Sequence, residues 1–365
     1  MSSSAGNTRR LALPVVMATS FSMMLGACAS SVGPSAGAPA ATSARSSSIP
    51  TVSPRPTPTP SPTPAATALK PTAVVPLKNV SDAIPVTTDG RDLWVGVNGG
   101  IVKVDGSTNK TSRFTADMRT GNGTVAYRDG VLWLSDYSGG KVERVDPSTG
   151  TVLTKADVSG PVEFVFPGDG VWVGSEKDVT MMRLDPRTAK VTSTIAGNSR
   201  MVAGMGELWH GSQPGEDPAV TEVDPATGAD VAATPVPQGS QCTVTGSFPD
   251  NVWAGCTPFQ SGGSADAATV VRIDPKTHTV VTSVTLPGFL DVVVVNGFPW
   301  FLVPSDGSDG PALSLYKVDP ATGQVLAVRD LGSLDPNAPV VTDNAVWIPD
   351  QAGQRLVRLD ASTLT

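Results

Sequence analysis

This chain of 365 residues offers no convincing catalytic apparatus. It has only two histidines, His210 and His278, which leaves few ligands for a transition metal. No Gly-x-Ser-x-Gly elbow joins a strand to a helix, and no phosphate-binding glycine-rich loop precedes a helix. The net charge of −7 argues against nucleic acid as a partner, because phosphate binding requires an excess of Lys and Arg. We therefore predict no catalytic residue and no metal ligand.

The cysteine with the clearest chemistry is Cys28. Arg9 and Arg10 precede an apolar run, residues 11–24, that is too short to span a bilayer as a stable helix. Leu25-Gly26-Ala27-Cys28 follows and resembles the bacterial lipobox, whose cysteine receives a diacylglycerol thioether. The resemblance implies a lipoprotein signal peptide over residues 1–27, cleavage before Cys28, and acyl chains such as palmitate that anchor the protein to the outer face of the cytoplasmic membrane. Export by the Sec or the twin-arginine route stays open.

Residues 28–71 read as the lipidated cysteine followed by a linker. Nearly all are Ser, Ala, Pro, Thr or Gly, and residues 54–64 alternate proline with other, mostly small polar residues. Such a segment cannot form a core and favours an extended polyproline II conformation. We predict a disordered, semi-rigid spacer; a tolerated tail without a spacer role, or an O-glycosylated tract, fits the same composition.

Seven tryptophans divide the rest of the chain into repeats of 37 to 47 residues. Each lies in a short apolar run, as in Gly170-Val171-Trp172-Val173, and a second apolar run that ends in Asp follows it. The tryptophans are Trp94, Trp133, Trp172, Trp209, Trp253, Trp300 and Trp347. A repeat of this length built of short strands is typical of a propeller blade. We therefore predict an all-β, seven-bladed β-propeller over residues 72–365.

The aspartates that end the second apolar run are assigned a structural role. Five of them begin an Asp-Pro-x-Thr sequence, in which the carboxylate accepts hydrogen bonds from following N–H groups and proline presets φ. The seven are Asp105, Asp146, Asp185, Asp224, Asp274, Asp319 and Asp360. Each blade would then consist of strand a before the tryptophan, strand b around it, strand c up to the aspartate and strand d after the turn.

Residues 72–77 are predicted to close the ring. They precede the first strand a without a strand c before them, and the last repeat stops after Asp360, before its strand d could form. As strand d of the seventh blade they would leave no sheet edge open. The linker would then join the ring at the outer edge of the last blade, beside the C-terminus.

The sequence pattern of the repeats resembles that of the YVTN/YncE-like and virginiamycin B lyase-like seven-bladed propellers. The Asp-Pro-x-Thr-Gly and Gly-x-x-Trp-Val elements carry this resemblance over about Pro71 to Thr365. They specify a fold better than a function. The lyase relatives use a histidine-based acid–base group, and neither His210 in strand b nor His278 in an outer turn fits that role.

Cys242 and Cys256 are predicted to form a disulfide. They are equidistant from Pro249, so an a–b hairpin centred there would place them directly opposite each other. Outside the cytoplasm two such thiols would be oxidised.

The ligand face of a propeller is built from the d–a and b–c loops around its channel. The Trp-to-Asp spacing is 15, 21 and 19 residues in the fourth to sixth repeats and 11 to 13 elsewhere, which suggests a raised binding rim. Surface loops that vary in length without a functional role would give the same spacing. The candidate ligand-face residues are Asp136, Tyr137, Arg200, Gln241, Asp291 and Asp350. Solvated rim residues would look the same from sequence.

No cofactor is predicted. The blade 6 segment Asp306-Gly307-Ser308-Asp309-Gly310 could chelate Ca²⁺, but it lacks the twelve-residue EF-hand pattern.

The function predicted from these features is a non-enzymatic binding or scaffold module. We expect a monomer tethered to the membrane through its lipid, with a protein, glycan or small ligand outside the cytoplasm as its partner. The alternative is a metal-assisted hydrolase or lyase, lactonase-like or virginiamycin B lyase-like, that acts in the central channel. Three or more carboxylate or Asn oxygens converging in the channel would favour the enzyme, whereas an apolar lining with isolated charges would favour binding.

Overall fold

The computed structural model describes residues 62–80, 84–114, 123–198, 200–212, 216–237, 240–248, 251–258, 267–307 and 310–365. The expected signal peptide, Cys28 and the linker as far as residue 61 lie outside this range. No helix in the described ranges is both long enough and apolar enough to cross a membrane.

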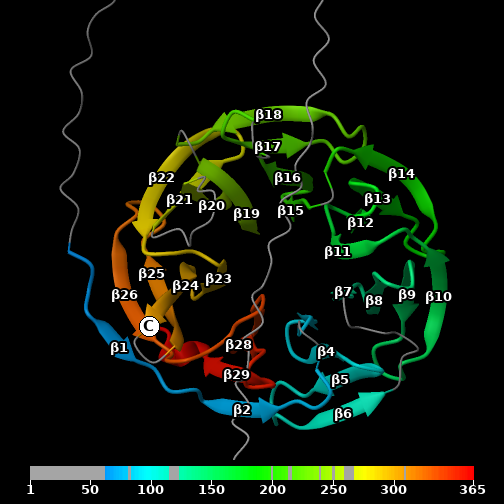
Figure 1. The fold of residues 1–365 in the computed structure, drawn as a ribbon, viewed down its shortest axis with the longest axis horizontal. Helices are drawn as coiled ribbons and strands as arrows, with labels where there is room; N and C mark the ends of the chain where they lie inside the picture. The colour runs from blue at the N-terminus through cyan, green and yellow to red at the C-terminus, as the bar shows by residue number, and fades with distance from the viewer. Residues whose placement is uncertain are drawn as a thin grey trace, which may run out of the picture. The chain divides into compact units, whose positions relative to one another are not determined.

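Seven sheets of antiparallel strands are arranged in a ring (Figure 1), which confirms the predicted all-β, seven-bladed propeller. The first four blades run from the innermost strand a to the outermost strand d. Blade 1 is β3 (Val86–Thr88), β4 (Leu93–Val97), β5 (Gly100–Val104) and β6 (Thr111–Phe114); blade 2 is β7 (Val125–Arg128), β8 (Val131–Asp136), β9 (Lys141–Val145) and β10 (Val152–Asp157); blade 3 is β11 (Pro161–Val165), β12 (Val171–Ser175), β13 (Thr180–Leu184) and β14 (Val191–Ala196); blade 4 is β15 (Val202–Gly204), β16 (Glu207–Gly211), β17 (Ala219–Val223) and β18 (Asp230–Pro235).

The remaining blades include the two N-terminal strands. Blade 5 is β19 (Ser240–Phe248), β20 (Asn251–Pro258), β21 (Ala268–Asp274) and β22 (Thr279–Leu286); blade 6 is β23 (Asp291–Val295), β24 (Phe298–Gly307), β25 (Gly310–Val318) and β26 (Val325–Asp330) with β1 (Ala66–Ala68) beside it; blade 7 is β27 (Val340–Thr342), β28 (Ala345–Asp350), β29 (Arg355–Asp360) and β2 (Ala73–Pro76). A single 3-10 turn, η2 (Ala361–Thr363), follows β29 in the described residues.

The tryptophans form the contacts between neighbouring blades. Each is at most 2% exposed and belongs to an apolar cluster with residues of the following blade; Trp347 of blade 7, for example, packs with Leu93 and Val95 of blade 1. Strand b is apolar on both faces because blades cover it on both sides; β4 is buried at every position. One tryptophan in each repeat therefore supplies the core between that blade and the next.

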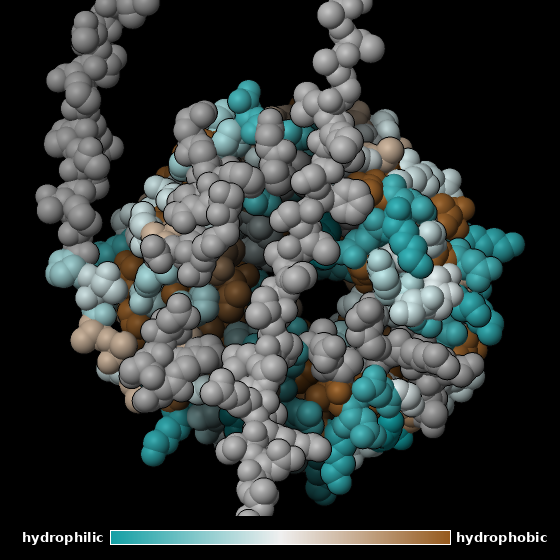
Figure 2. All heavy atoms as spheres, in the orientation of Figure 1, coloured by the Kyte–Doolittle hydropathy of each residue, from teal (hydrophilic) through white to brown (hydrophobic). Residues whose placement is uncertain are grey.

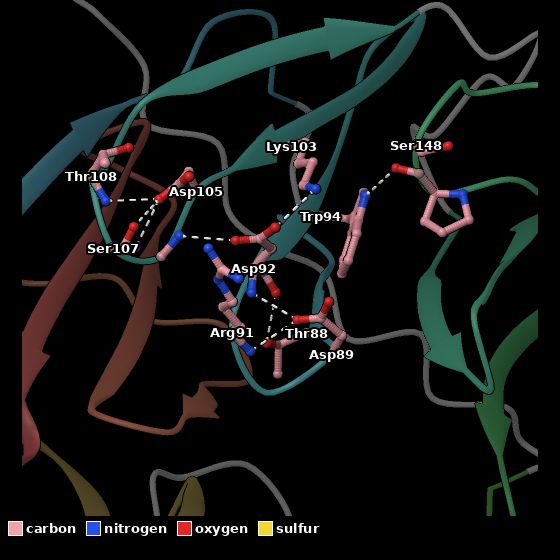
Figure 3. A network of polar contacts seen from close by, with 12 residues as sticks. Thr88, Asp89, Arg91, Asp92, Trp94, Lys103, Asp105, Ser107, Thr108 and Ser148 are labelled. Carbon is pink, nitrogen blue, oxygen red and sulfur yellow. Dashed lines mark hydrogen bonds and ion pairs between the residues drawn. The ribbon is translucent and has the colours of Figure 1, made fainter.

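The first six repeated aspartates cap the turns between strands c and d, as predicted, whereas Asp360 makes no side-chain cap and pairs with Arg358 instead. Asp105 accepts hydrogen bonds from the N–H groups of Ser107 and Thr108 at 2.9 and 2.8 Å (Figure 3). In the same figure the Trp94 indole Nε1 donates to the carbonyl oxygen of Pro147, 3.0 Å away in the corresponding turn of blade 2. These turns thus shape their own blade and bind the preceding one.

The ring is closed by the N-terminal strand β2. It pairs antiparallel with β29, with Val74 opposite Val357, and is the outermost strand of blade 7. This is the pairing that the sequence predicts for residues 72–77, since the last repeat has no strand d of its own.

Strand β1 lies within the range predicted as linker, and here the structure differs from the expectation. Residues 66–68 pair in parallel with β26 as a fifth strand on the outer edge of blade 6. Arg329 of β26 donates from Nη1 to Thr67 Oγ1 at 2.9 Å and from Nη2 to the oxygen of the C-terminal residue Thr365 at 3.2 Å. The chain thus joins the ring along blade 6, next to the C-terminus, before it completes blade 7 (Figure 1).

The predicted disulfide is confirmed, but the hairpin register differs from the one assumed. Cys242 and Cys256 are directly paired, with Cα atoms 4.0 Å apart. The last pair of the hairpin is Phe248 with Asn251, one residue out of step with a turn centred on Pro249. A bulge between Val244 and Gly246 restores the register and brings the cysteines face to face.

Part of the predicted rim consists of longer strands. In blade 6, β24 and β25 remain paired as far as Gly307 with Gly310, and in blade 5 β19 and β20 pair as far as Ser240 with Pro258. Their b strands have 10 and 8 residues, against 5 or 6 in the other blades. Some of the extra residues in these two repeats therefore lengthen paired strands of the blade and do not form separate loops.

Candidate functional site

A cavity of about 720 Å³ lies among the innermost strands of the ring. Figure 2 shows an opening near the centre of the face in view. The cavity is lined by residues of β3, β7 and β11 and of the segments that lead into β15 and β27. These residues are Ile84, Pro85, Val86, Thr87, Gly123, Thr124, Val125, Ala126, Tyr127, Val162, Glu163, Phe164, Phe166, Arg200, Asn337 and Ala338. The walls are mostly apolar, and Glu163 and Arg200 are the charged residues among them.

One position of the repeat supplies these charges. In every blade the residue of strand a that pairs with the tryptophan precedes it by seven residues, as Val165 does for Trp172. Two residues earlier, on the same side of the strand, is the position we call the channel ring. Six blades place the following residues there: Pro85, Thr124, Glu163, Arg200, Asp291 and Ala338. In blade 5 the bulge in β19 alters this register, and in blade 3 the pairing of β11 with β12 is irregular between Pro161 and Phe164, which flank Glu163.

Glu163 is the acidic residue on the cavity wall. Its side chain is exposed to the channel but enclosed by protein, and no hydrogen bond joins it to another described residue. This loss of bulk water raises the pKa of the Glu163 carboxyl, and the positive charge of Arg200 only partly opposes the effect.

Asp291, the first residue of β23, occupies the channel ring of blade 6 but is not among the residues that line the cavity. Burial raises the pKa of Asp291 to about 7; the N–H of Val292, which donates to its Oδ1 at 2.7 Å, lowers it, and the carboxylate of Glu163 raises it further. At neutral pH the Asp291 carboxyl is therefore only partly ionised.

Arg200 is exposed, and its guanidinium is engaged by an ion pair with Glu176. Its backbone N–H donates to Asn198 Oδ1 at 2.8 Å, which orients the segment that enters β15. Arg200 is the predicted ligand-face residue that lines the cavity, whereas Asp291 is not among the lining residues.

Asp136 and Asp350, also predicted for the ligand face, serve as turn caps. Each follows the tryptophan of its blade by three residues and accepts a hydrogen bond from a glycine N–H, Gly139 at 2.8 Å and Gly353 at 3.2 Å. Asp350 is buried and forms an ion pair with Arg355 at 2.6 Å. Their carboxylates hold b–c turns and do not line the cavity.

Tyr137 and Gln241 also lie outside the cavity lining. The Lys177 ammonium is 5.3 Å from the centre of the Tyr137 ring, and Gln241 is exposed on β19 opposite Thr257.

Glu163 is not predicted from the sequence because it stands within strand a of blade 3, whereas the predicted ligand-face residues were assigned to the b–c and d–a loops. The available signal was the offset of nine residues before each tryptophan, at which a charged residue stands in only three of the seven repeats.

The histidines lie where the sequence predicts. His210 is in β16, with Nδ1 2.9 Å from the carbonyl oxygen of Gly211, and His278 is in the turn between β21 and β22. Within the described ranges, no three His, Cys, Asp or Glu side chains are grouped as metal ligands. Ser308 and Asp309 of the weak Ca²⁺ candidate lie outside the described residues.

Comparison with solved structures identifies the same architecture in other proteins. Similar folds occur in a mitotic checkpoint complex (TM-score 0.62, 11% identity, 84% of this chain and 98% of that chain), in the computationally designed Ika8 protein (0.53, 16%, 78% and 98%) and in BamB from Moraxella catarrhalis (0.50, 14%, 82% and 99%). At these identities the likeness shows the fold alone. No protein-family model matches the chain, and no curated protein matches its sequence.

Proposed function

We propose that this protein is a binding module that holds a ligand in its central channel without transforming it. The observation that carries this proposal is the lining of the cavity, where apolar side chains surround one carboxylate and one guanidinium. Binding sites commonly combine an apolar wall with a few charged or polar groups that orient the ligand. A volume of about 720 Å³ suits a small molecule or one extended side chain of a protein or glycan partner.

The second part of the proposal concerns location. Cys28, at the end of a lipobox-like sequence, would carry the lipid that anchors the protein to the outer face of the bacterial cytoplasmic membrane. The linker would hold the propeller away from the membrane surface, and the protein would be a monomer. The position of β1 on the outer edge of blade 6 supports such display, because β1 lies apart from the innermost strands that line the cavity.

A metal-assisted hydrolase or lyase remains the alternative to a binding module. It requires several ligand atoms that converge on one metal ion, whereas the cavity lining includes one carboxylate among mainly apolar groups. We therefore prefer the binding function.

A photo-crosslinker placed in intact cells tests the binding function. p-Benzoylphenylalanine at Ala338, an exposed residue of the cavity lining, should form an adduct of defined mass with the ligand. The matched control is the same substitution at Val231, which is 54% exposed on the outermost strand of blade 4. Equal labelling at both positions, or no adduct at Ala338, would overturn the proposal.

A further inference from the structure

The ring depends on the N-terminal strand β2 for its closure. Val75 of β2 and Leu77 just after it are 3% and 6% exposed, and both belong to the apolar cluster that joins blades 7 and 1 around Trp347. Strand β2 has only four residues and lies at the outer edge of blade 7. A pull on the chain that precedes β2 would therefore separate it from β29 one hydrogen bond after another and open the ring.

Residues 66–72, which we call the strap, lie between the linker and β2 and are attached to blades 6 and 7. β1, the first part of the strap, pairs with β26 at the outer edge of blade 6 (Figure 1). The N–H of Leu69 continues this pairing and donates to the carbonyl oxygen of Asp330 at 2.8 Å. The N–H of Thr72 donates to the carbonyl oxygen of Arg358 in blade 7, also at 2.8 Å. The strap thus crosses from one blade to the next.

Packing of side chains does not account for β1. Ala66, Thr67 and Ala68 are all exposed, and of the strap residues Leu69 is the one that packs against the apolar cluster of blades 6 and 7. The other six sheets in the described part of the chain have four strands each, so a blade is complete without a fifth strand. What β1 adds is polar contact with β26, including the bond of 2.9 Å from Arg329 Nη1 to Thr67 Oγ1.

These contacts precede β2 on the path of any force that enters from the linker. Such a force must break the pairing of β1 with β26 and the hydrogen bond of Leu69 before it acts on Ala73, the first residue of β2. Until then the force passes into β26, which is paired with β25 inside blade 6. While the strap is attached, β2 is not under tension.

We propose that the strap is a tension clamp that transfers the pull of the membrane tether to blade 6 and protects the ring-closing strand β2. This inference rests on the proposed tethering of the chain at Cys28. It predicts that the ring stays closed for longer under force when β1 is paired with β26.

Proline substitutions can remove the pairing of β1 selectively. Successive residues of a strand direct their N–H groups to opposite edges, so the N–H of Thr67, two residues before Leu69, faces β26, and the N–H of Ala68 faces away from it. Thr67→Pro therefore removes a donor from the pairing, whereas Ala68→Pro leaves the pairing intact and is the matched control. Urea unfolding of both variants establishes that they are folded.

Single-molecule force measurements on the full chain without lipid test the proposal. One handle is attached to the thiol of Cys28, because Cys242 and Cys256 are joined in the disulfide, and the other to an azide-bearing residue at position 231 on the outermost strand of blade 4. Loss of the strap alone lengthens the chain by at most about 25 Å, and a larger extension marks the loss of β2. At constant force the ring of Thr67→Pro should open roughly two- to tenfold faster than that of the wild type or Ala68→Pro, since it lacks at least one hydrogen bond.

The position of the first handle separates protection from tension from a general stabilisation of the ring. With the handle on Lys78→Cys in a Cys28→Ser chain, the force enters beyond β2 and bypasses the strap, so the further substitution Thr67→Pro should not change the opening rate. Equal opening rates of the wild type and Thr67→Pro under a pull from Cys28, or the same acceleration from both handles, would overturn the proposal. Neither result depends on lipid at Cys28, so a failure of the clamp is distinguished from a failure of membrane anchoring, which fractionation of Cys28→Ser cells tests.

Discussion

His278 of blade 5 lies with its Nε2 2.5 Å from Oε2 of Glu222 in blade 4. Glu222 is paired with Trp209 across β16 and β17. In the other six blades the residue opposite the tryptophan is a cation: Lys103, Arg144, Arg183, Arg272, Lys317 and Arg358. Several of these cations reach the next blade, as Arg144 does when its Nη1 donates to the carbonyl oxygen of Arg187 at 2.7 Å. Blade 4 makes the equivalent contact to the next blade with an acid, Glu222, in place of the cation.

The Glu222–His278 pair should couple the two blades energetically. Both side chains are largely withdrawn from solvent, at 12% and 27% exposure, so the contact is less screened than a surface pair. We expect Glu222→Gln and His278→Gln each to lower the free energy of unfolding by about 1 kcal/mol, with the double variant costing little more than one of them. Denaturant unfolding of the four proteins measures this coupling. Strictly additive losses would show that the pair does not act as a unit.

The disulfide should contribute to stability through the unfolded chain. Cys242 and Cys256 are separated by 14 residues, and closing a loop of this size restricts the unfolded state by about 3 kcal/mol. The double variant Cys242→Ser, Cys256→Ser should lose roughly 2–3 kcal/mol, as should the wild type after reduction. Its own stability should not respond to reductant, which serves as the control. A wild type that is equally stable with and without reductant would contradict the expectation.

The blades were predictable because one side chain defines them. Trp94 and its six counterparts fill the contact between blades, and only a large apolar residue at that position of every repeat closes the ring. The cysteine pair was predictable from spacing, but the bulge between Val244 and Gly246 was not, because a bulge is decided by packing between strands. Strand β1 could not be predicted from the sequence for a similar reason. Its three small residues form a strand only because they pair with the exposed edge of β26.

The candidate site was less accessible to sequence reasoning. A carboxylate three residues after a tryptophan can face the channel or cap the b–c turn, and the nearby N–H groups of Gly139 and Gly353 direct Asp136 and Asp350 to the turn. Arg200 and Asp291 were predicted because they stand where the d–a segments lead into strand a, Arg200 just before β15 and Asp291 as the first residue of β23. Glu163 has the same repeat position, but the apolar residues around it make it look like an ordinary strand residue.

The aspartates of the c–d turns should make the protein sensitive to acid. The hydroxyl of Ser107 holds the pKa of Asp105 below its usual range, and the N–H of Thr188 does the same for Asp185; Asp146, Asp224 and Asp274 are lowered by equivalent bonds. A carboxyl whose pKa is lowered by folding stabilises the protein above its unfolded pKa, about 3.9, and loses that contribution as the pH falls through its folded pKa.

Stability measured by urea unfolding should therefore be constant near pH 5 and decrease progressively below about pH 4. Asp105→Asn keeps an acceptor in the turn but removes one titrating group, so its stability should decline less steeply with acid. Equal stability of the wild type at pH 5 and pH 3 would exclude this role for the turns.

Removal of the proposed lipid should release the protein from the membrane. Two acyl chains on one cysteine provide stable anchoring, since each buried CH₂ contributes about 0.8 kcal/mol. Cys28→Ser should therefore move the protein from the membrane fraction to the soluble fraction or the medium, and the mass of the acylated N-terminus should be lost. Cys242→Ser is the matched control, because it removes a thiol without touching the lipobox. A Cys28→Ser variant that still sediments with membranes would contradict lipid anchoring.

The buried carboxyl of Asp291 should weaken the fold as the pH rises. Its pKa is raised on folding to about 7, so the stability that it allows is fully present below its unfolded pKa, about 3.9, and is lost as the pH rises through about 7. Asp291→Asn removes this penalty and keeps the shape of the side chain. We expect the variant to gain about 1–3 kcal/mol over the wild type at pH 8 and little at pH 5, by denaturant unfolding without ligand. Asp129→Asn, at an exposed turn, should show no such difference between the two pH values. A penalty of the same size at pH 5 and pH 8 would mean that Asp291 is ionised throughout, which would contradict the raised pKa.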